Sequence, residues 1–281
     1  MRKPEWLRVR FTETPNRENV EQTLSRLNLN TVCREANCPN YSECFSNKTA
    51  TFMLLGTNCT RSCRFCNVCN GQPQQVNPEE PKNVAQAVNE LGLKYVVITS
   101  VTRDDLPDGG AKHFSKAILE IKQASPGVAI ETLVPDFMGN IRSIEIVAMA
   151  SPDVISHNME TVKSLYSKLR PQAEYYRSLK VLQRVKLSNK RVRSKSGIML
   201  GFGETKEEVY ELFEDLRNIG CEFLTIGQYL APSKKHFPVQ EYVEPSRFEE
   251  YGARAKAMGF DFVASAPLVR SSYNAGEALG L

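Results

Sequence analysis

Short apolar runs rich in β-branched residues alternate with amphipathic segments from Thr51 to the end of the chain. Seven of these runs have the length and composition of buried strands, and they lie at 50–56, 95–100, 128–134, 152–158, 192–200, 221–227 and 260–265. Between them, apolar residues recur at helical spacing in segments 83–92, 113–123, 206–220 and 246–259. Six or seven such units predict an α/β fold, a partial TIM barrel of the (β/α)6 type, because the strands are too few for a closed eight-stranded barrel.

This pattern divides the chain into three parts. Residues 1–50 lack the strand–helix alternation and predict an irregular, cysteine-rich extension. Residues 51–266 form the predicted barrel, and residues 267–281 form a short carboxyl-terminal segment. The 281 residues are 41% hydrophobic and 24% charged, without repeats or low-complexity tracts, which is typical of one globular unit.

Composition and charge exclude several classes of protein. No stretch approaches the roughly 18–20 apolar residues of a membrane span, and the first residues lack the apolar core of a signal peptide, so we expect a cytoplasmic protein without a membrane partner. A net charge of +4 is too small to indicate a nucleic-acid partner. Five basic residues between Lys186 and Lys195 favour a solvated face, with an acidic partner as the alternative.

Seven of the eight cysteines lie between Cys33 and Cys69. In a reducing compartment such a cluster favours metal or redox chemistry over disulfides. Six of them form two triplets, Cys33, Cys38 and Cys44, and Cys59, Cys63 and Cys66. Three cysteines are one ligand short of a closed zinc site, whereas an iron–sulfur cubane held by three cysteines leaves one iron open. We interpret Cys69 as a spare thiol, with a ligand role as the alternative, and Cys221 as a small buried apolar residue.

The second triplet follows the first predicted strand, at the edge where barrels of this type build active sites. Its spacing, in CTRSCRFC with the aromatic Phe65 before the last cysteine, resembles the radical S-adenosylmethionine superfamily. The resemblance implies a [4Fe-4S] cluster on Cys59, Cys63 and Cys66 whose fourth iron binds S-adenosylmethionine. Reduction of that cluster would release a 5′-deoxyadenosyl radical that abstracts hydrogen from an unactivated carbon. A zinc knuckle or an electron-transfer cluster is the alternative.

The first triplet, in VCREANCPNYSEC, resembles the lipoyl synthase family. Further similar segments are KPEWL, TSVTRDDLPDGGAKHF, SHNMETV, LRPQAEYYRSL, KSGIMLGFGET, LTIGQYLAPSKKHFPVQEYV and PLVRSSYNAGE. The resemblance implies an auxiliary [4Fe-4S] cluster on Cys33, Cys38 and Cys44 that donates sulfur. Its fourth ligand would be a serine of the Arg270–Tyr273 motif, Ser272 being favoured and Ser271 the alternative.

The reaction implied by this resemblance inserts two sulfur atoms, at carbons 6 and 8 of an octanoyl chain on a lysine of a carrier protein. The implied carriers are the lipoyl domain of a 2-oxoacid dehydrogenase and the glycine-cleavage carrier protein. A flavodoxin or ferredoxin would supply electrons, and an iron–sulfur cluster carrier would rebuild the auxiliary cluster.

Candidate contacts for S-adenosylmethionine lie mainly at the ends of the predicted strands. Gly201 and Glu204 lie in the glycine-rich segment GIMLGFGE, which resembles a superfamily motif, and Arg170 suits a carboxylate because a guanidinium can bind it with two hydrogen bonds. The other candidates are Phe65, Thr99, Ser100, Glu131, Asn158 and Glu160. We expect His157 and His236 to satisfy local hydrogen bonds.

Two alternatives to this function stay open. One is another radical enzyme that inserts sulfur, of the biotin or methylthiolating type, although those families place their auxiliary ligands elsewhere in the chain. The other is an iron–sulfur electron carrier or a zinc-stabilised interaction module, which would need neither a barrel nor a glycine-rich strand motif.

Overall fold

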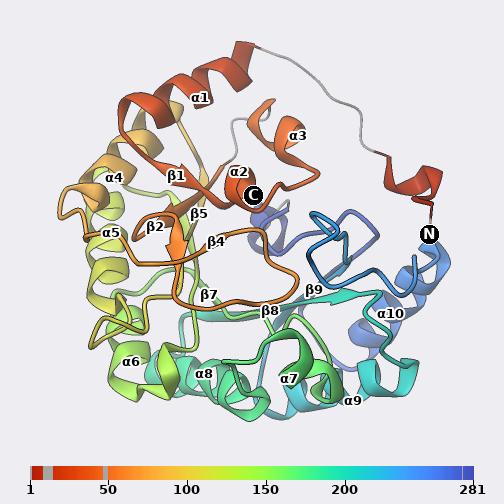
Figure 1. Ribbon diagram of the computed structural model, residues 1–281. Coiled ribbons are helices and arrows are strands. Elements are labelled where there is room, and N and C mark those ends of the chain that lie inside the picture. The colour runs from red at the N-terminus through yellow and green to blue at the C-terminus, as the bar shows by residue number, and fades with distance from the viewer. Residues whose placement is uncertain (1, 9–14, 47–49, 274) are drawn as a thin grey trace.

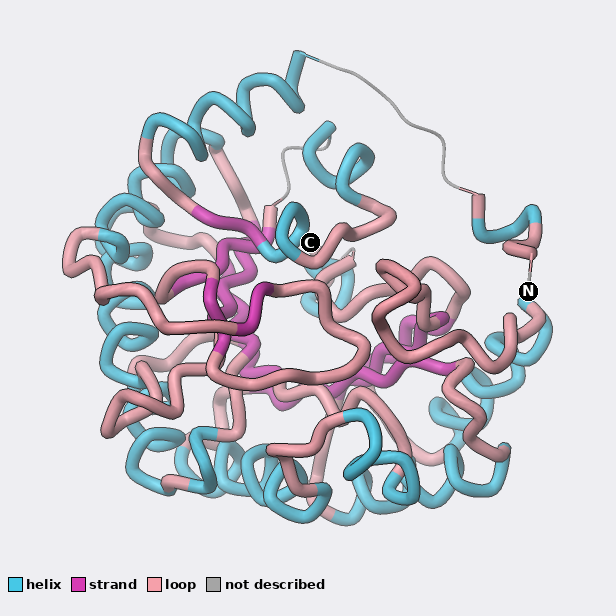
Figure 2. The backbone as a smooth tube through the Cα atoms, viewed as in Figure 1, coloured by secondary structure: helices cyan, strands magenta, loops and turns pink. Residues whose placement is uncertain are grey.

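A computed structural model describes residues 2–8, 15–46, 50–273 and 275–281. Its main sheet has eight strands in the order β1-β2-β5-β6-β7-β8-β9-β10. All neighbours pair in parallel except β1, which is antiparallel to β2. Because β1 and β10 are the two edges and do not pair, the barrel is open. Figures 1 and 2 show the curved sheet with helices around its outer side.

The strands of the main sheet are β1 (Asn30–Thr31), β2 (Thr51–Leu54), β5 (Tyr95–Ser100), β6 (Ala129–Leu133), β7 (Val154–Ser156), β8 (Arg193–Leu200), β9 (Phe223–Gln228) and β10 (Phe262–Ser265). The principal helices are α1 (Pro15–Arg26), α2 (Val32–Glu35), α3 (Tyr41–Ser46), α4 (Glu80–Leu91), α5 (Ala111–Ala124), α6 (Ile141–Met149), α7 (Tyr166–Leu169), α8 (Tyr175–Ser188), α9 (Lys206–Asn218) and α10 (Pro245–Ala257). Short 3-10 turns are η1 (Glu5–Leu7), η2 (Phe137–Gly139), η3 (Lys163–Leu165) and η4 (Ala275–Leu279). None of the helices in these described ranges is long and apolar enough to cross a bilayer.

Each of the seven predicted runs contains one strand of the parallel part of the sheet, so the prediction of an open β/α barrel is confirmed. Local chemistry explains several boundaries. A capping box between Thr205 and Glu208 starts α9, and Gly92, in a left-handed conformation, ends α4. The apolar faces of the helices pack on the outer face of the sheet and form the core there.

Residues 15–46 contain more regular structure than the sequence pattern predicts. Helix α1 packs on α3 and α4, and β1 extends the sheet beside β2. The pattern misses α1 because only Val20, Thr23 and Leu24 are buried along its twelve residues. Strand β1 has two residues and depends on its partner strand for its conformation.

The basic run between Lys186 and Lys195 is not a uniformly solvated face. Lys186 and Arg193 form ion pairs with Glu222, and Lys195 is 1% exposed. Lys195 lies within β8, where it pairs with Glu131 of β6 at 2.9 Å between Nζ and Oε2. The expectation of a solvated face is therefore wrong for Lys195.

Candidate cluster-binding and cofactor-binding site

The second cysteine triplet lies in a tight loop between two short paired strands, β3 (Asn58–Cys59) and β4 (Cys69–Asn70). The backbone N–H of Cys66 donates to the carbonyl of Cys63 at 3.1 Å, which curls the loop. Cys63 and Cys59 lie close enough to Cys66 to act on it electrostatically. Burial first, and then these neighbouring thiols, raise the pKa of Cys66 to about 12.

A buried arginine holds this loop against the barrel. Arg61 donates to both oxygens of Asp104 at 2.7 and 2.9 Å, and to Oδ1 of Asp136 at 2.6 Å. These ion pairs raise the pKa of Arg61 in spite of its burial, and they hold the pKa of Asp136 below its usual range. The sequence analysis missed Arg61, because only the fold brings both aspartates to it.

Aromatic packing and a histidine fix the same loop from the other side. The ring of Phe65 lies 6.0 Å from that of Phe202, in a cluster with Tyr229 and Phe237. His236 lies within hydrogen-bond distance of the Cys66 carbonyl, at 3.1 Å, and of the Ser233 hydroxyl, at 2.9 Å.

The first triplet forms a second compact group. Cys33 lies on α2, which begins at the cap made by Thr31, and Cys44 lies on α3. The N–H of Cys38 donates to the carbonyl of Cys33 at 3.1 Å, so the chain folds back between the two helices. Burial is the largest cause that raises the pKa of Cys33 to about 11 and that of Cys44 to about 12, and mutual repulsion of the thiolates adds to it.

The two remaining cysteines differ in exposure, and the burial predicted for Cys221 is confirmed. All eight cysteines lie in the described ranges and all are free thiols, so no disulfide competes for the two triplets. Cys221 is fully buried and Cys69 is exposed. As a small buried residue, Cys221 belongs to the core between α9 and the sheet.

Each of the two triplets could hold an iron–sulfur cluster. In the part of the chain that the structure describes, no three His, Cys, Asp or Glu side chains converge on one metal position. A cubane does not require three side chains to converge on one metal position, because each cysteine binds a different iron. The buried thiols also need a positively charged partner before they can act as thiolates, and iron would supply it.

We expect the alkylation rate of Cys44 in the cluster-free protein to rise by about tenfold per pH unit from about pH 7 to about pH 10, because a pKa of about 12 keeps the thiolate fraction small throughout. For a thiol of ordinary pKa, roughly 8.5, the alkylation rate would stop rising above about pH 9. Iodoacetamide labelling followed by peptide mass spectrometry measures the rate, with the exposed Cys69 as an internal reference for the reagent. A plateau for Cys44 near about pH 9 would contradict the expectation.

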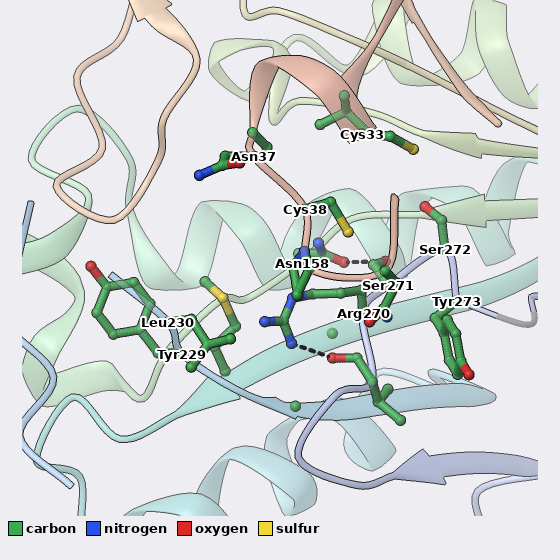
Figure 3. Close-up of a pocket in the computed structure, with 18 of the residues that line it drawn as sticks. Cys33, Asn37, Cys38, Asn158, Tyr229, Leu230, Arg270, Ser271, Ser272 and Tyr273 are labelled. Carbon is green, nitrogen blue, oxygen red and sulfur yellow. Dashed lines mark hydrogen bonds between the residues drawn. The ribbon is translucent and has the colours of Figure 1, made fainter. Parts of the chain in front are cut away.

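One cavity of about 520 Å³ joins the two triplets. Among the residues that line it are Cys33, Cys38, Cys44, Phe65, Cys66, Asn158, Glu160, Gly197, Arg270, Ser271 and Ser272. Figure 3 shows residues of the amino-terminal extension, of the barrel and of the carboxyl-terminal segment around this space. Residues separated by more than 200 positions meet beside it, since Nδ2 of Asn40 donates to the backbone carbonyl of Leu268 at 2.8 Å.

The Arg270–Tyr273 motif is anchored on both sides. The hydroxyl of Tyr273 donates to Glu43 at 2.9 Å, and the hydroxyl of Ser271 donates to Oδ1 of Asn158 at 3.0 Å. Within the described ranges the Ser272 side chain forms no hydrogen bond. It lines the main cavity and also an adjoining cavity of about 460 Å³, which Cys44 lines as well. Arg270 is close enough to Cys38 to oppose the effect of burial on the pKa of that thiol.

Gly227 allows the carboxyl-terminal segment to approach the sheet. A Cβ at this position would lie 2.0 Å from the carbonyl oxygen of Val269, next to the Arg270–Tyr273 motif. The sequence analysis singled out neither Gly227 nor Gly197, where a Cβ would lie 2.9 Å from Oδ1 of Asn158. Glycines inside strands are a signal for such close approaches.

We expect Gly227→Ala to lower the free energy of unfolding by about 1–3 kcal/mol, because the Val269 carbonyl must move to admit the methyl group. Gly71→Ala is the matched control, since its Cβ would meet only the Asn58 amide, at 4.0 Å. Equilibrium urea unfolding of both variants measures the difference. Equal stability of the two would contradict the close approach.

Three of the predicted cofactor residues lie together. Asn158 and Glu160 follow β7 and line the cavity, and Arg170 donates through Nη1 to the carbonyls of Asn158 and Met159 at 3.1 and 3.3 Å. Arg170 lies beside Cys63 and partly offsets the burial that raises the pKa of that thiol. Within the described part of the chain, the buried Nε of Arg170 has no hydrogen-bond partner.

Phe65 also lines the cavity, whereas its lining does not include Arg170, Thr99, Ser100, Glu131, Gly201 or Glu204. Glu131 is fully buried, and its carboxylate accepts from Tyr95, Ser156 and Lys195 at 2.5–2.9 Å. The Thr99 hydroxyl donates to the Leu133 carbonyl at 2.9 Å, whereas that of Ser100 is buried without a partner among the described residues.

The glycine-rich segment is also bonded within itself. Both carboxylate oxygens of Glu204 accept backbone N–H groups, from Gly201 at 2.6 Å and from Phe202 at 2.9 Å. A Cβ at Gly201 would lie 2.2 Å from the Gln228 amide and 2.4 Å from the Glu241 carbonyl, so protein already fills that side. The structure therefore gives Gly201 and Glu204 a role in shaping the turn.

His157 forms the local hydrogen bond that we expected. Its Nδ1 lies 2.8 Å from the carbonyl of Val134. Burial, and then the charge of Arg170, lower the pKa of His157 to about 4, so the ring is neutral near pH 7.

Comparison with known proteins agrees with this geometry. Residues 53–216 match the family described as the radical SAM superfamily. The solved structure of a methylornithine synthase has a TM-score of 0.54 and 15% identity, over 93% of this chain and 81% of that one. Coproporphyrinogen III oxidase from Escherichia coli, titled a radical SAM enzyme, has a TM-score of 0.53 and 12% identity, over 80% of this chain and 57% of that one. At these identities the likeness shows the fold.

Two more similar relatives match almost the entire chain. The lipoyl synthase of Alkaliphilus metalliredigens (strain QYMF) is 56% identical over 278 residues, 99% of this chain and 96% of the relative. The lipoyl synthase of Caldanaerobacter subterraneus subsp. tengcongensis is 57% identical over 282 residues, 100% of this chain and 98% of the relative. The chain therefore belongs to the lipoyl synthase family of the radical S-adenosylmethionine superfamily.

Proposed function

We propose that this enzyme inserts sulfur at carbons 6 and 8 of an octanoyl chain that is amide-linked to a lysine of a carrier protein. The observation that supports this most is the single cavity lined by Cys33, Cys38 and Cys44 of one triplet and by Cys66 of the other. Sulfur insertion into an alkyl chain needs a radical source and a sulfur donor that face the same substrate, because such C–H bonds have no acidic proton for a base to remove.

The residues of both triplets fit [4Fe-4S] clusters. When bound, S-adenosylmethionine on the cluster of Cys59, Cys63 and Cys66 supplies a radical source, and the cluster of Cys33, Cys38 and Cys44 supplies sulfur. The protein holds both triplets rigidly, with Arg61 beneath one loop and Asn40 beside the other group.

Ser272 is the better candidate for the fourth ligand of the auxiliary cluster. The hydroxyl of Ser271 already donates to Asn158, whereas the Ser272 side chain lines both cavities beside Cys44. A serine oxygen is a poor ligand for iron that prefers sulfur, so it would be displaced easily when the cluster is consumed.

We assign the contacts with S-adenosylmethionine to Phe65, Asn158, Glu160 and Arg170. Arg170 would bind the methionine carboxylate, since its guanidinium lies beside Cys63 and suits a carboxylate. The absence of a side chain at Gly197 leaves room beside Asn158. Apolar residues of the cavity, Leu133, Ile198, Met199, Tyr229 and Val269, suit the octanoyl chain.

The proposal extends to partners and compartment. The carriers would be the lipoyl domain of a 2-oxoacid dehydrogenase or the glycine-cleavage carrier protein, with a flavodoxin or ferredoxin as electron donor and a cluster carrier for repair. Eight free cysteines suit a reducing compartment such as the cytoplasm.

An anaerobic assay tests the function. The reconstituted protein is mixed with S-adenosylmethionine, a strong reductant and an octanoyl-lysyl peptide, and peptide mass and 5′-deoxyadenosine are followed together. Gain of two sulfur atoms per peptide supports the proposal. Formation of 5′-deoxyadenosine without any gain of sulfur, while both clusters are intact, would leave the radical chemistry and overturn the substrate.

A further inference from the structure

The side chain of Asn158 lies between the two triplets. Its Oδ1 accepts a hydrogen bond from the Ser271 hydroxyl at 3.0 Å, and its Nδ2 donates to Oε1 of Glu160 at 3.1 Å. Its backbone carbonyl accepts from Nη1 of Arg170, the residue beside Cys63, at 3.1 Å. Figure 3 shows Asn158 and Ser271 joined across the cavity, with Ser272 following on the same segment.

These bonds determine which way the Asn158 amide faces. The carboxylate of Glu160 requires a donor and therefore the NH₂ end, while the Ser271 hydroxyl donates to the oxygen end. Without Ser271, only the bond to Glu160 would hold the amide. The backbone of Asn158 stays in place because Arg170 binds its carbonyl.

We propose that Ser271 is a positioning residue that couples the auxiliary-cluster site to the S-adenosylmethionine site through Asn158. The inference rests on the proposed function, in which Asn158 contacts S-adenosylmethionine and Ser272 binds the auxiliary cluster. Ser271 orients Asn158 for the cofactor, and a bound cofactor in turn holds Ser271, and with it Ser272, in place. Because coupling between two sites is reciprocal, the effect can be measured from the cofactor side alone.

Tyr273 provides a matched control. Its hydroxyl also forms one hydrogen bond from the same motif, to Glu43 at 2.9 Å, but Glu43 belongs to the amino-terminal extension and is not a hydrogen-bond partner of Asn158 among the described residues. Tyr273→Phe therefore loosens the motif by one hydrogen bond without changing the partners of Asn158. Ser271→Thr keeps the hydroxyl and serves as the conservative rescue.

The experiment measures the dissociation constant of S-adenosylhomocysteine, a non-cleavable probe, by anaerobic equilibrium dialysis with the reconstituted two-cluster protein. We expect Ser271→Ala to bind the probe about fivefold more weakly than wild type, the effect of one net hydrogen bond of ~1 kcal/mol. Ser271→Thr and Tyr273→Phe are expected to stay within about twofold of wild type. Iron content is measured for each variant.

Three results would overturn the coupling. Ser271→Ala with wild-type affinity would show that Ser271 does not orient Asn158. Equal weakening in Ser271→Ala and Tyr273→Phe would mean general loosening of the motif. If Ser271→Ala alone lost the iron of one cluster, Ser271 would itself be a ligand of that cluster. A different pair of results separates the coupling from the proposed function. If wild-type protein yields 5′-deoxyadenosine but no sulfurated peptide, the proposed substrate is wrong. If only Ser271→Ala then binds the probe more weakly, the coupling still holds.

Discussion

Replacement of Cys33, Cys38 or Cys44 by alanine is expected to abolish sulfur insertion while 5′-deoxyadenosine continues to form. The three thiols form a group separate from Cys59, Cys63 and Cys66, and the cavity that they line is also lined by Cys66. Loss of one auxiliary ligand removes the sulfur donor, whereas the radical source keeps its own three cysteines. Peptide mass and 5′-deoxyadenosine, measured in the same anaerobic reaction, separate the two effects.

Two controls make this result specific. Cys69→Ala is expected to keep both activities, because Cys69 is exposed and outside both triplets. Cys59→Ala is expected to lose both, because without the radical cluster no hydrogen is abstracted. A Cys33→Ala protein that still adds sulfur to the peptide would reject the assignment of the first triplet as the sulfur donor.

Lys195→Met is expected to lower the free energy of unfolding by about 3–5 kcal/mol, which would be the largest stability loss among the changes considered. The side chains of Lys195 and Glu131 are 1% and 0% exposed, and their charged groups lie 2.9 Å apart inside the barrel. The substitution leaves the Glu131 carboxylate buried with only Tyr95 and Ser156 as partners. Burial and the nearby carboxylate raise the pKa of Tyr95, so its hydroxyl stays a donor.

The same measurement on two further proteins tests the cause. A double variant, Lys195→Met with Glu131→Gln, is expected to recover much of the loss because no charge stays buried without a partner. Arg247→Met removes an ion pair to Glu241 whose side chains are 46% and 49% exposed, and it should cost at most about 1 kcal/mol. Equilibrium urea unfolding that gives Lys195→Met a loss as small as that of Arg247→Met would contradict a buried pair.

Predictions based on local pattern agree with the structure. Strands recur where β-branched apolar runs were found, because the length and composition of such a run are properties of a short segment. Cys59, Cys63 and Cys66 lie together because the eight positions from Cys59 to Cys66 form one short segment, which cannot separate them far. The resemblance to the lipoyl synthase family likewise depends on linear motifs, and the full-length matches confirm it.

The cofactor candidates predicted from strand ends lie in different surroundings. Asn158 and Glu160 line the cavity, whereas Thr99 and Glu131 are bonded to neighbouring strands. A polar residue near a strand end can face the cavity or the next strand, and the partner that decides this lies far away in the chain. The partners of Glu204, in contrast, are close in the sequence, since its carboxylate accepts the backbone N–H groups of its own turn.

By itself, therefore, the sequence determined the order of strands and helices, the two cysteine triplets and the family. Tertiary structure alone decided that Asn40 and Glu43 meet residues 228 and 230 positions away, at Leu268 and Tyr273, and that the second triplet shares their cavity. It also decided that the Ser271 hydroxyl is taken up by Asn158, which leaves Ser272 as the candidate ligand. The physical reason is that spacing along the chain constrains only nearby atoms, whereas contacts over such separations form only when the sheet curves and both extensions pack against it.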